Sequence, residues 1–243
     1  MVREENLYAA IENYALAMEL TNTKIALTMV RDLLGPEAEE NVAGSSFSHS
    51  LKAAKLLIDL HIMLPLEEED LLLASMLCHD LLEQVEFPEA LQEMVMDNGL
   101  DGRVLQVVHL VSRPHGLEED KKQAYYDNIG SNKLAVLVIL ADHCNQVEAL
   151  SRLTISQVNA YCDETRNYLL PLCVQAKQFY GDCHMSVHIM MEKIRNLMDV
   201  SDIIAKRYQK REAAYTDEIL ELMEENARLR RMICQFEAGE YGK

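Results

Sequence analysis

The chain has 243 residues, 49% of them hydrophobic, and a formal net charge of −17, which argues against a nucleic-acid-binding protein because phosphate contacts need clustered Lys and Arg. No apolar run approaches the ~18–20 residues that cross a membrane, and the acidic first 20 residues do not have the pattern of a signal peptide. The six cysteines contain no C-x-x-C pair, so we expect reduced thiols and a cytoplasmic protein.

The composition predicts an all-α fold, because Leu, Ala, Glu and Met dominate whereas Pro and Gly are scarce. Amphipathic and apolar segments, with their cap and breaker residues, place the expected helices along the chain. In chain order they cover 6–20, 23–34, 47–63, a helix opened by Pro65 that runs through His79 and Asp80, 88–97, 104–112, 118–129, 134–150, 155–180 and 184–236.

Two of these segments and one boundary carry specific expectations. The β-branched run 134–141 is compatible with a buried strand, but its continuation without a turn signal favours a buried helix. Pro171 lies inside the next long helix, so we expect a kink near Asn167. A Gly-Asp break then predicts one domain at 1–182 and a helical extension at 183–243.

The stretch 74–84 places polar side chains in apolar surroundings. In a continuous helix, His79, Asp80 and Glu83 lie on roughly one face. A buried His-Asp pair needs a partner, because an unpaired buried charge is energetically costly. That partner is either a metal ion or an Arg or Lys, and neither cationic residue type occurs in the surrounding sequence from 56 to 102.

His49 and Asp142 are the other polar residues that occupy apolar surroundings. Together with His79 and Asp80 they provide two imidazoles and two carboxylates, a set suited to Mn²⁺ or Fe²⁺ more than to a cysteine-preferring Zn²⁺ site. Structural alternatives exist for both residues. A His in the first turn of a helix is usually a cap or surface residue, and Asp142 equally suits a turn or cap at the end of an apolar run.

The order of these residues resembles the HD superfamily of metal-dependent phosphohydrolases, and most closely the hydrolase domain of the RelA/SpoT alarmone enzymes. The resemblance spans about Thr23 to Tyr180. It rests on four pieces: Phe47-Ser-His-Ser-Leu-Lys-Ala-Ala54, the stretch 74–84, Leu137-Val-Ile-Leu-Ala-Asp142 and Glu164-Thr-Arg-Asn-Tyr-Leu-Leu-Pro-Leu172.

The resemblance implies an all-α HD-domain helical bundle that is followed here by a long C-terminal helix. It also implies one divalent ion, Mn²⁺ with Fe²⁺ or Zn²⁺ as alternatives, held by His49, His79, Asp80 and Asp142. The implied reaction is removal of pyrophosphate from the ribose 3′ position of (p)ppGpp.

One departure from the family bears on catalysis. The family has Glu-Asp after its His-Asp, whereas this chain has Glu83-Gln84. A glutamine orients a water molecule but does not accept its proton, and loss of a general base typically costs ~10²–10⁴ in rate. We therefore expect Glu83 to act as the base and Gln84 to orient the attacking water.

Other departures bear on the substrate. Gln146 stands where the family has Asn, and acidic residues at 37–42 replace a basic loop that holds nucleotide phosphates in the family. Lys52, Lys55 and Arg113 remain as candidate phosphate-binding cations, and Tyr168 matches a family Tyr near the nucleotide. The structural alternatives are solvated surface charges for the three cations and ordinary helix packing for Tyr168.

Two functional hypotheses follow. The first is a metal-dependent phosphohydrolase that acts on a phosphorylated small molecule, with a nucleotide such as (p)ppGpp as the leading candidate, and the four-ligand set favours it. The alternative is a catalytically weakened HD module that binds a nucleotide or a protein partner, and Gln84 and the acidic loop favour it.

The C-terminal segment has a heptad pattern from Ile219 onward. The a positions are Ile219, Asn226 and Ile233, and the d positions are Leu222, Leu229 and Phe236. Ile at a, Leu at d and a single Asn at a favour a parallel two-stranded coiled coil, with Glu225 and Arg230 placed for an interchain ion pair. The alternatives are a homodimer through this helix and packing of the helix on its own domain.

Overall fold

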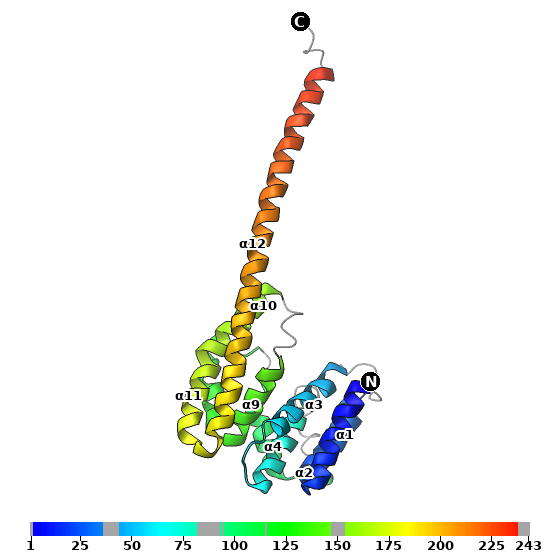
Figure 1. Cartoon of the computed structure of the whole chain (residues 1–243), viewed down its shortest axis with the longest axis vertical. Helices are drawn as coiled ribbons and strands as arrows, with labels where there is room; N and C mark the ends of the chain where they lie inside the picture. Colours follow the sequence, from blue (N-terminus) through cyan, green and yellow to red (C-terminus); the bar gives the residue numbers. More distant parts are fainter. Residues whose placement is uncertain are drawn as a thin grey trace. The chain divides into compact units, whose positions relative to one another are not determined.

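The computed structural model describes residues 2–35, 44–81, 93, 95–114, 116–146 and 154–237, and within these ranges the chain is helical without any strand (Figure 1). The all-α fold class predicted from the composition is therefore confirmed. In this part of the chain, none of the helices combines the length and the apolar character that a membrane crossing requires.

The helix bounds follow the expected segments closely. They are α1 (Val2–Ala17), α2 (Thr21–Leu34), α3 (Gly44–Asp59), α4 (Leu66–Cys78), α7 (Gly102–Val111), α8 (Glu119–Gly130), α9 (Lys133–Gln146), α10 (Ile155–Glu164), α11 (Leu170–Phe179) and α12 (His184–Glu237), with a π-helical turn at Thr165–Leu169 and a 3₁₀ turn at Gly181–Cys183. The helix expected at 88–97 lies mostly outside the described residues.

Helix α9 is the central element of the bundle. It packs against α3, α4, α7 and α8, and every residue from Ala135 to Cys144 is buried. A helix that is apolar all round is stable only when other helices cover it on all sides. The prediction of a buried helix rather than a strand at 134–141 is confirmed, and the helix delivers Asp142 to the interior of the bundle.

A buried carboxylate joins α2 to α4. Helix α2 begins without a side-chain cap of its own, so its first amide groups need acceptors. Asp70 on α4 supplies them, since its carboxylate accepts from the backbone N–H of Asn22 at 2.9 Å and of Thr23 at 2.8 Å. The Thr23 hydroxyl donates to the same carboxylate at 2.8 Å, and these bonds fix α2 along α4.

The long helix expected at 155–180 is divided by the π-helical turn. The sequence predicted a kink near Asn167, and the turn is centred on that residue. In an α-helix the N–H of residue 171 would bond the carbonyl of Asn167, but Pro171 has no N–H. Instead the Leu170 N–H donates to the Thr165 carbonyl, five residues earlier, which is the π-helical pattern.

The structure divides into two compact units, residues 1–197 and 198–243. Helix α12 begins at His184, close to the boundary predicted at 182, and its first residues belong to the first unit. There Val187, Met191 and Ile194 are buried. The second unit consists of the remainder of α12, which is a single unbroken helix as far as Glu237 (Figure 1).

Candidate metal centre and adjoining cavity

His79 is positioned by the end of helix α4. The sequence predicted a helix that continues through Asp80, but α4 ends at Cys78 and His79 is its C-cap residue, so that expectation is wrong by two residues. His79 keeps helical dihedral angles, and its Nδ1–H donates to the carbonyl oxygen of Met76 at 2.7 Å. This bond occupies Nδ1 and leaves Nε2 as the nitrogen that faces the interior.

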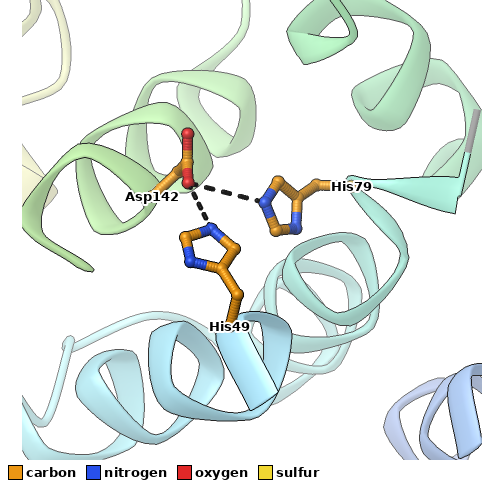
Figure 2. A group of neighbouring side chains, drawn as sticks. All are labelled: His49, His79 and Asp142. Atoms are coloured by element: carbon orange, nitrogen blue, oxygen red, sulfur yellow. Dashed lines mark hydrogen bonds and ion pairs between the residues drawn. The ribbon is translucent and has the colours of Figure 1, made fainter. Parts of the chain in front are cut away.

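His49 from α3 and Asp142 from α9 converge on the same point as His79 (Figure 2). His49 Nε2 lies 2.6 Å from Asp142 Oδ1, and His79 Nε2 lies 3.6 Å from the same oxygen. One potential ligand atom from each of the three residues lies within 4.8 Å of the others. Residues up to 93 positions apart in the chain therefore meet in one cluster, as the sequence predicted for a metal site.

Asp80, the fourth predicted ligand, lies beside His79 but is not part of the three-residue convergence. Its Oδ1 lies 3.0 Å from His79 Nε2, and its side chain is about one-fifth exposed whereas the His79 side chain is almost fully buried. His79 Nε2 is a buried atom without a hydrogen bond of acceptable geometry, even though two carboxylates lie near it. A buried polar nitrogen in this state is costly unless a proton or a cation sits between it and the carboxylates.

The electrostatics of the cluster favour a cation. Burial by itself would lower the pKa of His79, but the charges of Asp80 and Asp142 outweigh that effect and raise it to about 9. Burial would raise the pKa of Asp142, but the adjoining His49 and His79 rings hold it well below its usual range. In the metal-free protein a proton therefore sits on His79 near neutral pH, at the place where a divalent ion would bind.

Two side-chain amides of α9 hold the ligand groups in place. Gln146 Nε2 donates to Asp142 Oδ2 at 2.7 Å, which leaves Oδ1 directed at the two histidines. Asn145 Nδ2 lies 2.9 Å from the carbonyl oxygen of His49 and 2.9 Å from its Nδ1. Gln146, expected to bind substrate, is in contact with a predicted metal ligand. Asn145 was not predicted, although an amide one residue before Gln146 was the available signal.

A cavity of about 440 Å³ opens beside the cluster. His79, Asp80, Asp142 and Gln146 form part of its wall, and Arg113, Tyr125, Tyr126, Tyr161 and Glu164 form much of the rest. Its size is in the usual range for small-ligand sites. Three of the four predicted metal ligands, His79, Asp80 and Asp142, thus line one space with the predicted cation Arg113, whereas His49 is not among the lining residues.

Arg113 is anchored by Glu164 on the cavity wall. Its Nη1 and Nη2 lie 2.8 and 2.9 Å from the two carboxylate oxygens of Glu164, which also accepts from Tyr126 Oη at 3.0 Å. Lys122 Nζ lies 3.0 Å from the same carboxylate. Burial would raise the pKa of Glu164, but Arg113 and Lys122 hold it below its usual value. The sequence does not predict this cluster, because Arg113 and Glu164 lie 51 residues apart.

The remaining predicted site residues lie away from the cavity wall or outside the described residues. Lys52 is a half-buried residue of α3, three positions after His49, and is not among those that line the cavity. Tyr168 stacks on the cavity residue Tyr126 with ring centroids 5.6 Å apart, and its hydroxyl donates to Glu119. Glu83 and Gln84 lie outside the described residues.

The donor set fits a divalent ion on the observations of this structure. Two imidazole nitrogens and a carboxylate oxygen converge, a second carboxylate lies 3.0 Å from one of the nitrogens, and that nitrogen is buried without a hydrogen bond. Nitrogen and oxygen donors of this kind suit Mn²⁺, Fe²⁺ or Zn²⁺. No known protein-family model matches the chain, and a search of curated proteins finds no similar sequence.

Proposed function

We propose that the chain is a divalent-metal-dependent phosphohydrolase of the HD type that acts on a phosphorylated small molecule, with (p)ppGpp as the leading candidate substrate. The observation that carries the proposal is the buried Nε2 of His79, which lacks a hydrogen bond, faces Asp142 and Asp80, and borders a cavity large enough for a nucleotide moiety. The order of these residues in the chain, which resembles the RelA/SpoT hydrolase domain, supports the same conclusion.

In this proposal His49, His79, Asp80 and Asp142 hold one ion, with Mn²⁺ as the expected metal. When bound there, the ion supplies Lewis-acid chemistry, lowering the pKa of a bound water and polarising a phosphoryl oxygen. Gln146 keeps Asp142 Oδ1 directed at the ion site by holding the other carboxylate oxygen at 2.7 Å. The Met76 carbonyl does the same for His79 by fixing its Nδ1–H.

The predicted catalytic residues and the polar groups of the cavity wall have separate roles in the proposal. Glu83 takes the proton of the attacking water, and Gln84 orients that water. Arg113 contacts a phosphate of the substrate, and Glu164 holds its guanidinium by two bonds so that little side-chain entropy is lost when the phosphate binds. Tyr125, a partly exposed residue of the cavity wall, offers an aromatic surface to a nucleobase.

The test is product release from defined substrates. The Mn²⁺-loaded protein is incubated with (p)ppGpp and with a panel of nucleoside mono-, di- and triphosphates, and released pyrophosphate and phosphate are measured separately. We expect pyrophosphate from (p)ppGpp, loss of that activity in His79→Ala, and no effect of His109→Ala, a change at an exposed histidine of α7. Release that is equal in the wild type and His79→Ala would show that the activity does not depend on this centre.

A second function is favoured by the charges around the cavity. Among the described residues that line it, Arg113 is the one Lys or Arg side chain, whereas Asp80, Asp142 and Glu164 contribute carboxylates. This excess of carboxylates over cations suits a substrate with few negative charges. It also suits a weakened module that binds a nucleotide without turning it over. Equilibrium binding of (p)ppGpp that requires Arg113, without any product release, would establish this alternative in place of the hydrolase.

A further inference from the structure

The second compact unit presents an apolar stripe along one helix. In α12 the side chains of Val200, Ile204, Tyr208, Tyr215, Ile219, Leu222, Leu229 and Ile233 are each between 48% and 61% exposed. Large apolar side chains arranged in a continuous row on a helix are typical of a surface that another helix covers. The stripe extends over about 50 Å, because each helical residue advances 1.5 Å.

The spacing of the stripe shows that one face of α12 carries it throughout. From residue 200 the core positions follow at intervals of 4, 4, 3, 4, 4 and 3 residues to Leu222, and then at 4, 3 and 4 to Ile233. The first part has an 11-residue period, which corresponds to 3.67 residues per turn, and the second has the heptad period of 3.5. Both periods keep the same face directed at a partner helix. The apolar seam that begins as a heptad pattern at Ile219 therefore continues upstream to Val200, there with the 11-residue period.

Two polar residues, Arg211 and Asn226, occupy core positions of the stripe. Asn226 occupies an a position in the heptad part, where a pair of facing asparagines fixes the register of a parallel dimer at some cost in stability. Arg211 occupies a core position in the upstream part, and its guanidinium carbon lies 5.8 Å from the ring centroid of Tyr215. That contact places the charged end of Arg211 over a ring that itself belongs to the stripe.

The residues that flank the stripe are complementary to a second copy in parallel register. In a parallel, in-register coiled coil, the residue just before an a position lies beside the residue five positions later on the partner helix. Glu225 is thereby placed beside Arg230, and the sequence puts Arg207 and Glu212 in the equivalent relation. The other flanking pair in the seam, Glu218 with Met223, carries one charge, so like charges do not meet at these positions.

We propose that the stripe from Val200 to Ile233 binds a second copy of this chain, so that two α12 helices form a parallel, in-register two-stranded coiled coil. The apolar exposure requires a covering surface, Asn226 specifies two strands in register, and the flanking charges match an identical helix. In this dimer each copy keeps its own first unit, and therefore its own proposed metal centre.

The experiment compares two identical substitutions on opposite sides of the seam in the full-length chain. Leu222→Glu lies on the stripe and Leu220→Glu lies off it, yet the two leucines are 59% and 55% exposed. By sedimentation equilibrium we expect the wild type and Leu220→Glu to have about twice the 27.7 kDa chain mass. Leu222→Glu should raise the dimer dissociation constant by about 100-fold or more, because it buries two carboxylates in the seam. Circular dichroism checks that both variants keep the wild-type helix content.

Three outcomes would overturn the proposal. They are a monomeric wild type at concentrations of tens of micromolar, a dimer that Leu222→Glu does not weaken, and equal weakening by both substitutions. Strand orientation is tested with Leu229→Cys in a Cys234→Ser background, which leaves the other five cysteines buried. Oxidation should link the parallel dimer through the facing d positions, and a dimer that fails to cross-link there is not parallel and in register.

Discussion

His79 Nδ1 lies 2.7 Å from the carbonyl oxygen of Met76, three residues earlier in the chain. The bond uses a carbonyl group that the end of α4 leaves without an intrahelical partner. The end of the helix therefore selects which imidazole nitrogen is available to the interior. Because this carbonyl engages Nδ1, Nε2 is the ring nitrogen that lies towards Asp142.

Metal stoichiometry is the first prediction. After loading with Mn²⁺ and removal of excess metal, elemental analysis should find about one equivalent per chain and no second ion. His79→Ala should abolish the bound metal, because it removes the ligand whose buried Nε2 faces both carboxylates. His109→Ala serves as the matched control and should retain one equivalent. Stoichiometric Mn²⁺ in the His79 variant would show that the ion binds elsewhere.

The second prediction is the pH dependence of the metal-free protein and of its metal affinity. The folded-state pKa of His79 is raised to about 9 from 6.5, so its protonation stabilises the metal-free fold fully below pH 6.5 and ceases to do so as pH rises through 9. Because Mn²⁺ displaces this proton from the folded protein, its affinity should rise up to tenfold per pH unit below pH 9 and level off above it. Calorimetric titrations at several pH values measure the slope, and a flat profile would rule out the competition.

Glu83 and Gln84 provide the third prediction, which comes from the sequence. Glu83→Gln should remove about two or more orders of magnitude of turnover while the metal remains bound, since it deletes the proposed general base. Gln84→Asp should increase (p)ppGpp hydrolysis, because it restores the carboxylate that the resembling family has there. Rates measured at equal metal occupancy give the comparison. Absence of any gain from Gln84→Asp would direct the search to another substrate or base.

The fourth prediction concerns Glu164 as a structural anchor of the cavity wall. Glu164→Gln should lower the free energy of unfolding at neutral pH by about 1–3 kcal/mol, a range between exposed and buried ion pairs, because Arg113 and Lys122 lose a shared charge partner. Glu118→Gln, which affects an exposed pair with Lys121, should leave the unfolding curve nearly unchanged. Urea titrations of the three proteins measure the difference.

The same substitution has a pH signature. The folded-state pKa of Glu164 lies below its usual value of 4.5, so the stabilisation that it provides is present above pH 4.5 and is lost as pH falls through the folded-state pKa. The stability difference between wild type and Glu164→Gln should therefore shrink in acid. A difference that stays constant from pH 7 to pH 3 would mean that packing rather than charge is responsible.

Local sequence patterns predicted most of the helices because each pattern depends on neighbours within a few residues. The run 134–141 was long and apolar without a breaker, and it forms the fully buried α9. Pro171 predicted the irregular turn because proline has no N–H to donate to the carbonyl oxygen four residues earlier. The end of α4 was misplaced since Leu81 continues the apolar pattern and neither Gly nor Pro marks the helix end at Cys78.

The site was predicted where residue type alone carries information. His49, His79 and Asp142 stood out as titratable groups in apolar surroundings, and they meet within 4.8 Å. Contacts between segments that are distant in the chain produce no pattern in the local sequence. The bond from Asn145 to His49 spans 96 residues and depends on how α9 packs on α3. The Glu164 cluster likewise exists because α8 places Lys122 and Tyr126, and the segment after α7 places Arg113, around one carboxylate of α10.

The π-helical turn at Thr165–Leu169 gives this segment a local tolerance of changes in length. Such a turn holds one residue more than a turn of the α-helix around it, so deletion of a single residue there would convert it into regular α-helix. Because the wider turn takes up the extra residue, α11 would keep nearly the same orientation about the helix axis relative to α10. The same deletion in a regular α-helix would rotate everything that follows by about 100°. Leu172, Cys173 and Ala176, which are buried in α11, would therefore stay directed at the core after a deletion inside the turn and would leave it after a deletion in α10.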